Sequence, residues 1–473
     1  MAHGDISART LTTPAHHRGL FFSLSVMMFL EFFIWGAWFE LNFGYLPSLG
    51  FNDKWQQPLI LGAFNLGALV ALFVGTQFVD RHYSAERFLA LSHLVGGLAI
   101  LGLFFVHRGS DDVVGTAKDP SFWLFLALML IYSLFYVPTI SITNSIAFTH
   151  LKDAQREFGL VRVWGTIGWI VASWPFIFIL VDWANVPEYG SVSFVDWLGT
   201  ALGTAKKDDD FRQASRYIFL VAGIASLLLA AYSLWLPHTP PKQAGIGGER
   251  LAWLEALKLL RKPFVFILFI VTFLDAAVHQ SFFYWTERFL TGKVGIPSNW
   301  ATPVMKIGQV AEIVTMIFLG YVLKRLGWRY TMILGVLGHA ARFAVFAFFP
   351  EKAPAILINV VHGICYAFFF ATVYIFVDEF FPKDVRSSAQ GLFNVLILGI
   401  GPFVANFACG RLKSHYAYTT EAGIKTVDYP AVFEYSIIAG LIGALILAVF
   451  FNPEVSKREP DFNQAEVDAP AAP

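Results

Sequence analysis

Long apolar stretches separated by short polar segments make up most of this chain. About 20 predominantly apolar residues are enough for an α-helix to cross a bilayer. Helix is the expected state, because an open strand would leave backbone N–H and C=O groups without hydrogen bonds in lipid. The pattern therefore predicts twelve membrane-spanning helices, near residues 20–46, 56–79, 86–106, 120–148, 160–182, 215–236, 262–290, 304–324, 329–349, 353–380, 386–410 and 431–452.

The polar segments indicate how these spans are grouped. The most polar long link, 237–261, follows the sixth span and is rich in Pro and Gly, so we interpret it as a cytoplasmic linker. It separates two six-helix halves, 20–236 and 262–452. Residues 1–19 are predicted to form a cytoplasmic N-terminal segment. Residues 453–473, rich in Pro, Ala and acidic side chains, are predicted to form a disordered cytoplasmic tail.

Composition supports a membrane protein and excludes other classes. The chain is 56% hydrophobic and only 14% charged, whereas soluble domains carry about 25% charged residues. The formal net charge is zero, which gives no indication of a nucleic-acid partner. The two cysteines, Cys365 and Cys409, lie within apolar runs and suggest neither a disulfide framework nor a metal site. No HExxH or GxSxG motif is present, so we do not expect an enzyme, and we expect no cofactor.

Lys and Arg in the short loops predict the orientation of the chain. More of them fall on the side of the N-terminus than on the opposite side, which places both termini in the cytoplasm. The long segment 183–214, between spans five and six, carries a Lys-Lys-Asp-Asp-Asp run that is predicted to be a solvated loop. Its role stays open.

A loop pattern occurs at equivalent places in the two halves, between spans two and three and between spans eight and nine. Glycine there permits close helix approach, and the charged side chains can pair with helix ends. The arrangement resembles the cytoplasmic loop motif of the major facilitator superfamily, in which two six-helix halves rock about a central site. The residues concerned are Gly75, Asp80, Arg81, Gly320, Arg325 and Gly327.

Charged residues inside a span cost roughly 2.5–3.5 kcal/mol at the helix centre and are therefore functional candidates. In span one, Glu31 shares a helical face with Trp35, Trp38 and Asn42. The alternative interpretation is an aromatic packing stripe with a neutral carboxylate, but Glu31 would still need a partner.

Spans seven and eight carry further candidates. In span seven, Asp275 and His279 are one turn apart and can pair, either structurally or as a titrating unit. Gln280 can both donate to and accept from a polar solute. In span eight, Gln309 and Glu312 share a face with an apolar flank, which favours a carboxylate that binds substrate or a proton over a structural pair.

Three other spans add weaker signals. In span ten, His362 and Tyr366 share a face that could stack on a flat solute, although core packing explains it equally well. In span five, Arg162 and Thr166 share a face, and an arginine anchor at the cytoplasmic end is the alternative. In span nine, Arg342 is interpreted as a helix–helix hydrogen-bonding residue rather than a site residue.

Several literal sequence blocks are similar to the bacterial nucleoside:proton symporters of the major facilitator superfamily, over about residues 20 to 450. The most specific blocks are 29–38 (FLEFFIWGAW), 137–139 (VPT) with Asn144, 162–168 (RVWGTIG), 309–312 (QVAE) and 385–391 (VRSSAQG).

The resemblance implies a substrate site at the interface of the two halves. Family binding positions keep their residues at Arg162, Thr166, Gln280, Gln309 and Glu312. Family aromatic positions fall at Trp169, His362 and Tyr366, where the residue is altered but still bears a ring.

The sequence also departs from the family. Phe283 stands where an amide is expected, and Ala367 replaces an acidic residue. Glu31 stands where the family commonly has glutamine. One carboxylate is missing and another is present, which weakens the inference to nucleosides and makes Glu31 a hypothetical replacement proton carrier. Phe283 joins the residues expected to stack on the solute.

The resemblance therefore implies an importer of nucleosides that works by proton symport and alternating access. It would act as a monomer in the inner membrane of a bacterium. Glu31, Glu312 and Asp275 are the candidates for proton coupling. The alternative is a proton-coupled symporter of the same fold for a sugar or another small polar solute. The preferred nucleoside, and proton rather than sodium coupling, stay open.

Overall fold

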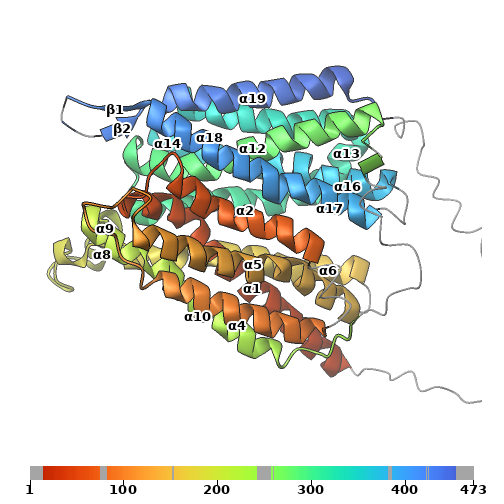
Figure 1. Cartoon of the computed structure of the whole chain (residues 1–473), viewed down its shortest axis with the longest axis horizontal. Helices are drawn as coiled ribbons and strands as arrows, with labels where there is room; N and C mark the ends of the chain where they lie inside the picture. Colours follow the sequence, from red (N-terminus) through yellow and green to blue (C-terminus); the bar gives the residue numbers. More distant parts are fainter. Residues whose placement is uncertain are drawn as a thin grey trace, which may run out of the picture. The chain divides into compact units, whose positions relative to one another are not determined.

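The computed structural model describes residues 14–74, 83–151, 154–241, 257–258, 260–381, 386–421, 423 and 425–453. The chain separates into two compact units (Figure 1). The first comprises Met1–Asn52 and Leu66–Ala244, and the second comprises Asp53–Asn65 and Gly245–Pro473. The described residues are mostly helical, which confirms the all-α prediction at this level.

The first unit contains the helices that precede the predicted linker. α10 packs on α4, α4 on α5, and α1 on both α6 and α10. α2 belongs to both units, because the boundary follows Asn65. The helices are α1 (Pro14–Ser48), α2 (Gln56–Val74), α4 (Ala85–Leu103), α5 (Pro120–His150), α6 (Ala154–Val171), α7 (Trp174–Ile179), the 3-10 turn η2 (Trp183–Asn185), α8 (Phe194–Gly203), α9 (Asp208–Ser215) and α10 (Tyr217–Ser233).

In the second unit, α13 packs on α19 and α15, and α12 packs on α18 and α19. The helices are α12 (Pro263–Gly292), α13 (Ser298–Phe348), α14 (Lys352–Leu357), the 3-10 turn η4 (Ile358–Val360), α15 (Val361–Cys365), the π-helical turn η5 (Tyr366–Ala371), α16 (Thr372–Phe380), α17 (Arg386–Asn394), the π-helical turn η6 (Val395–Ile400), α18 (Gly401–His415) and α19 (Tyr429–Phe450). A short antiparallel hairpin of β1 (Ala417–Thr419) and β2 (Lys425–Val427) pairs Ala417 with Val427.

Helix starts follow local sequence signals. The Asp119 side chain accepts a hydrogen bond of 2.9 Å from the Ser121 backbone N–H, and Pro120 occupies the first position of α5, where no N–H is needed. Asp428 caps α19 in the same way. Capping hydrogen bonds stabilise the polar ends of these helices, and packing of apolar side chains stabilises the rest of each helix.

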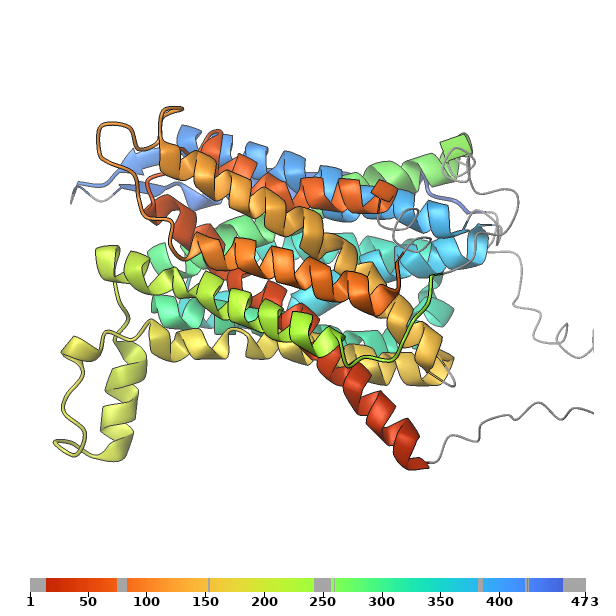
Figure 2. The same cartoon turned by 60° about the horizontal axis from the view of Figure 1, so that its bottom comes forward.

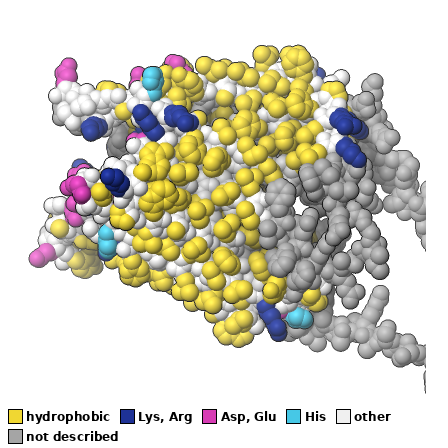
Figure 3. Space-filling model, viewed as in Figure 1, with side chains coloured by type: hydrophobic (Ala, Val, Ile, Leu, Met, Phe, Trp, Pro, Cys, Tyr) yellow, Lys and Arg dark blue, Asp and Glu magenta, His cyan; other side chains and the backbone are white. Residues whose placement is uncertain are grey.

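Within the described residues, ten helical stretches are long and apolar enough to cross a membrane, and a shorter apolar helix covers Gln56–Ala71. Exposed side chains of these helices are largely hydrophobic, for example Leu91, Leu94 and Leu98 of α4. On the visible face of each unit, Figure 3 shows hydrophobic side chains along the helices and charged ones near their ends. Exposed apolar surface of this extent marks a membrane protein that crosses the bilayer many times.

α13 covers the predicted spans eight and nine in one stretch of 51 residues. This stretch joins two helices across a kink that lies between the predicted spans 304–324 and 329–349, and Gly320 and Arg325 lie in the helix before the kink. The change of direction is confined to Gly327, whose φ of +70° favours glycine. The loop residues Gly75, Asp80 and Arg81 lie outside the described residues, as do 1–13, 454–473 and most of the linker.

The segment after α7 carries the charged run 206–210, which is largely exposed, as predicted, although its three aspartates are helical rather than part of a loop. A β-bridge between Val181 and Ala205 closes its base. Within it, α8 presents an aromatic cluster around Trp197, which contacts the rings of Trp183 and Tyr189. The three aspartates of the charged run form the first turn of α9, where the helix dipole favours negative charge. This excursion lies at the end of its unit opposite to the start of α1 (Figure 2).

Candidate functional site

A buried carboxylate–imidazole pair lies inside the first unit. Glu31 Oε2 of α1 is 2.9 Å from His93 Nε2 of α4, and both side chains are completely buried. Glu31 Oε1 accepts a hydrogen bond of 2.7 Å from the Thr139 hydroxyl of α5. His93 Nδ1 lies 3.0 Å from the Ser226 hydroxyl of α10. The partner that Glu31 requires is therefore His93, and the network joins four helices.

Arg162 and Trp169 of α6 face α1 in the same unit. The Arg162 guanidinium carbon lies 3.9 Å from the centre of the Phe32 ring. The Trp169 ring meets Trp35 edge-on, with centroids 5.1 Å apart. The helices approach closely because Gly168 has no side chain, and a Cβ there would overlap a backbone oxygen of α1. α6 thus places a cation and an aromatic ring beside the helix that carries Glu31.

A buried polar cluster in the second unit centres on Arg342. Its guanidinium donates hydrogen bonds of 2.9 Å to Nδ1 of His362 and of 2.9 Å to Nδ1 of His339. Because His362 belongs to α15, the prediction that Arg342 bonds between helices is confirmed. His362 Nε2 lies 3.4 Å from the side-chain amide of Gln309. Arg342, which was not predicted to be a site residue, is therefore connected through His362 to Gln309, which was.

Close helix packing brings Gln309 to His362. A Cβ on Gly308 would lie 2.7 Å from His362 Cβ, and a Cβ on Gly363 would lie 2.5 Å from the backbone N of Glu312. Only glycine at both positions lets α13 and α15 approach this closely. Glu312 itself is half-buried, as is Thr166 of the first unit.

Aromatic rings surround this cluster. The Phe283 ring lies 5.9 Å from the His362 ring, centroid to centroid, and the His279 ring lies 5.2 Å from the His362 ring. Tyr366 is 6.4 Å from His279 by the same measure. The structure therefore brings together three residues predicted to contact the solute, Phe283, His362 and Tyr366.

Asp275 has a different partner from the one that its spacing predicted. Its Oδ2 lies 3.5 Å from Nε2 of His339 of α13, and both side chains are fully buried. His279, one turn along α12, instead makes ring contacts with His339 and His362. The expected Asp275–His279 pair is wrong because α13 supplies a nearer imidazole. Asp275 thereby joins the Arg342 cluster.

Gln280 belongs to a chain of side-chain amides. Its Nε2 donates a hydrogen bond of 3.0 Å to Asn406 Oδ1 of α18. Asn406 Nδ2 donates to Asn65 Oδ1 at 3.2 Å, and Asn65 Nδ2 donates to the backbone oxygen of Leu398 at 2.8 Å. Gln280 is thus held by residues far away in the sequence.

Sequence reasoning missed His93, His339, Asn65 and Asn406. Each is a polar side chain within an apolar span and almost completely buried. A polar residue within an apolar span can be recognised in the sequence, but the residue to which it bonds cannot. Among the described residues, no group of three or more His, Cys, Asp or Glu is arranged to hold a metal ion.

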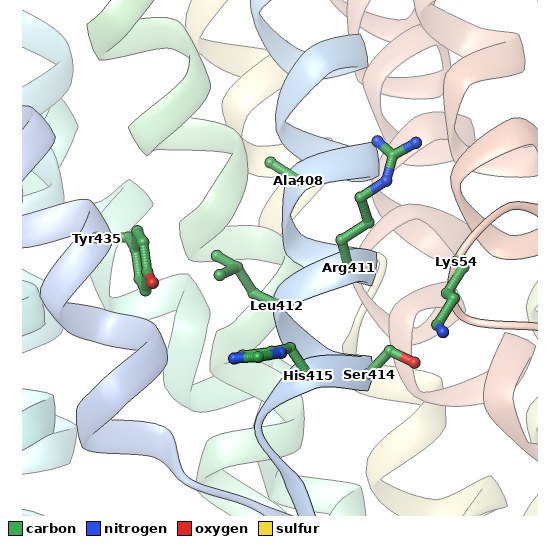
Figure 4. A pocket seen from close by; sticks show the side chains of 7 residues that line it. All are labelled: Lys54, Ala408, Arg411, Leu412, Ser414, His415 and Tyr435. Atoms are coloured by element: carbon green, nitrogen blue, oxygen red, sulfur yellow. The ribbon is translucent and has the colours of Figure 1, made fainter.

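A surface groove of about 780 Å³ lies at the end of α18. Figure 4 shows Arg411, Ser414 and His415 of α18 projecting around it, with Tyr435 on α19. No predicted site residue lines the groove. Its lining residues are Lys54, Ala408, Arg411, Leu412, Ser414, His415 and Tyr435.

The sequence comparison decides the classification of this chain. Residues 19–195 and 188–456 match the profile of the nucleoside H+ symporters. The chain belongs to the nucleoside H+ symporter family. The Escherichia coli (strain K12) protein YegT is 30% identical over 439 residues, which cover 91% of this chain and 93% of YegT. The xanthosine permease of the same organism is 26% identical over 445 residues, which cover 90% of this chain and 94% of the permease.

Solved structures share the fold of this nucleoside H+ symporter family member. The crystal structure of the nucleoside transporter NupG matches with a TM-score of 0.70 at 21% identity, over 92% of this chain and all of that chain. A D-xylose-proton symporter matches with a TM-score of 0.65 at 14% identity, over 92% of this chain and 98% of the other. The family and these relatives are transporters.

Proposed function

We propose that this protein imports nucleosides by proton symport, through alternating access of two six-helix halves. Membership of the nucleoside H+ symporter family supports this proposal. Twelve spans follow if the break at Gly327 divides α13 and α2 provides a further span. The protein would act as a monomer in a bacterial inner membrane with both termini cytoplasmic, an orientation that reporter fusions at the termini test.

The substrate roles follow the chemistry of the side chains. Gln280 and Gln309 offer amide groups, and Arg162 and Thr166 offer donors, to base edges and sugar hydroxyls. Trp169, Phe283, His362 and Tyr366 offer rings, and aromatic stacking suits a flat nucleobase. Apolar walls with few polar groups are typical of small-molecule sites. Glu312 is the carboxylate that shares a helical face with Gln309.

The Glu31–His93 pair carries the proton-coupling part of the proposal. The Ser226 hydroxyl donates to the backbone oxygen of His93 at 3.0 Å, so it must accept from His93 Nδ1. Nδ1 therefore bears a hydrogen. The contact of 2.9 Å between Nε2 and Glu31 Oε2 then needs one more proton, held on either atom. The closed pair stores a single proton.

Loss of this proton would break the contact, because the lone pairs of His93 Nε2 and Glu31 Oε2 would then face each other. A second proton is accommodated, since a protonated carboxyl still offers a carbonyl oxygen to the His93 N–H. Release of the proton therefore favours separation of α1 and α4 at this level, which links deprotonation to helix movement. Among the described residues, Tyr132 and Tyr136 of α5 interact electrostatically with Glu31, and Arg162 of α6 interacts with Tyr136. Glu312 and Asp275 are the further candidate carriers, in the second unit.

Transport into proteoliposomes tests the function. Wild-type protein should accumulate labelled uridine or adenosine when the outside is acidic, and D-xylose should not compete. Glu31→Gln should abolish gradient-driven accumulation but keep nucleoside counterflow, because it removes the proton site and leaves the substrate groups. Glu312→Gln is compared in the same assay. If both variants still accumulate nucleoside against a gradient, the assignment of the proton to these carboxylates is wrong.

A further inference from the structure

The two glutamines predicted to bind the solute present opposite ends of their amides. Gln280 and Gln309 are 7% and 6% exposed, so each has one enclosed partner and little access to water. An amide carries an accepting oxygen and a donating NH2 group. The two ends have similar size, so the hydrogen-bond partners decide which end points where.

Arg342 fixes the amide of Gln309 through His362. A guanidinium only donates, so Nδ1 of His362, 2.9 Å away, must be an unprotonated acceptor. A neutral His362 then carries its hydrogen on Nε2. That N–H lies 3.4 Å from the amide end of Gln309 that is drawn as Nε2. An N–H needs an acceptor, and the two ends of an amide are assigned from their hydrogen-bond partners, so we assign the amide oxygen to this position. The oxygen is thus turned inward and the NH2 group outward.

The outward end of the Gln309 amide needs a partner. The atom at this end, drawn as Oε1, is buried and has no hydrogen-bond partner among the described residues, and in the assigned orientation it is the donating NH2 group. A buried donor without a partner costs stability, and a bound solute that offers an acceptor removes that cost. The enclosed donor points to a carbonyl oxygen or a ring nitrogen as the group that Gln309 recognises.

The chain of side-chain amides orients the Gln280 amide in the opposite way to that of Gln309, with its NH2 group facing its protein partner. The backbone oxygen of Leu398 only accepts, so Asn65 must donate to it, Asn406 must donate to Asn65, and Gln280 must donate to Asn406. Leu398 lies in the π-helical turn η6, a type of turn that is frequent at functional sites. Gln280 Nε2 is therefore turned inward, and its oxygen is left for the solute.

We propose that these two relays make nucleoside recognition directional, with Gln309 donating to an acceptor and Gln280 accepting from a donor of the base. This inference rests on the proposed function. Uridine and cytidine have the same shape but exchange donor and acceptor at two neighbouring positions of the base, and inosine and adenosine differ in the same way. A site with fixed amides distinguishes the members of each pair. A site with rotatable amides accepts both.

Binding of the four nucleosides to the purified full chain in lipid nanodiscs tests the proposal. Wild type should separate each pair by about tenfold in Kd, the ratio that corresponds to one hydrogen bond of about 1.4 kcal/mol. His362→Phe and Asn406→Leu, which release the two glutamines, should bring the ratios close to one.

Two matched controls separate release of the amides from general damage. His339→Phe also removes one acceptor from Arg342 but does not touch Gln309. Asn359→Leu removes an equally buried Asn whose amide donates only to backbone oxygens of its own helical segment. Both should keep the wild-type ratios. Wild-type ratios near one, relay variants that keep their ratios, or controls that lose them equally would overturn the proposal.

A second measurement does not depend on transport. Solid-state NMR of the full chain with ¹⁵N-labelled histidine should show His362, identified by its loss in His362→Phe, as a neutral ring with the hydrogen on Nε2. A hydrogen on Nδ1, or a charged ring, would overturn the orientation of Gln309. If wild type binds no nucleoside, the proposed function fails, and this spectrum still decides the orientation.

Discussion

Removing His93 should leave the buried carboxylate of Glu31 without its imidazole partner. In His93→Leu, Glu31 loses a charge-assisted hydrogen bond, worth about 1.5–3 kcal/mol, and Ser226 loses a neutral one, worth about 0.5–1.5 kcal/mol. The expected loss in free energy of unfolding is therefore about 2–4.5 kcal/mol. Removing one member of a buried ion pair costs about the same in other proteins.

Unfolding by SDS titration from detergent micelles measures the free energy of unfolding of wild type and variant. Glu31→Gln together with His93→Leu should be less harmful than His93→Leu alone, because no charge is left without a partner.

Ser92→Ala provides the matched control. Ser92 is the neighbour of His93 in α4, is 1% exposed, and has no side-chain hydrogen bond among the described residues. Its loss should cost under about 0.5 kcal/mol. A His93→Leu loss below about 1 kcal/mol, or one that Glu31→Gln does not reduce, would refute the idea that Glu31 depends on His93 as its buried partner.

Three further predictions concern helix contacts and use the same unfolding measurement. Gly168→Ala should lower the free energy of unfolding by about 1–3 kcal/mol, since its Cβ would overlap the backbone of α1; a neutral effect would argue against this close contact. Trp38→Phe should cost about 1 kcal/mol through loss of the hydrogen bond of 2.9 Å to Tyr132, and a Tyr132→Phe partner variant should add little more. Lys413→Met should cost under about 1 kcal/mol and less in high salt, because its ion pair with Asp53 is partly exposed; a loss of several kcal/mol would contradict this.

The length of the apolar stretches predicts the helices. The spacing of residues along a single helix predicts part of the site. The separation of spans eight and nine was correctly located near Gly327, because glycine punctuates an otherwise continuous apolar pattern. Phe283, His362 and Tyr366 were expected to share one task, and their rings do lie together. In these cases the decisive information lies within one or two turns of helix.

Contacts between distant spans were not predictable. His93 lies 62 positions from Glu31, and Asn65 lies 341 positions from Asn406. A periodic pattern states which side chains share a face but not which neighbouring helix that face meets. The same limit explains why Asp275 was assigned to His279 instead of His339. The rotation of α12 about its axis determines which imidazole lies next to Asp275, and tertiary packing determines that rotation.

The π-helical turn η6 makes chain length matter differently on its two sides. A π-helical turn arises when one extra residue is accommodated in an α-helix, so the helix after the turn keeps its phase, whereas each residue of an ordinary α-helix advances the side chains by about 100°. Deleting one residue within Val395–Ile400 would restore the ordinary winding and leave Asn406 in phase with α17. Deleting one residue between Gly401 and Asn406 would instead rotate Asn406 by about 100° relative to α17 and turn it away from Gln280, although every hydrogen-bonding residue would still be present. A deletion scan would therefore find α18 before Asn406 less tolerant of a change in length than the π-helical turn itself.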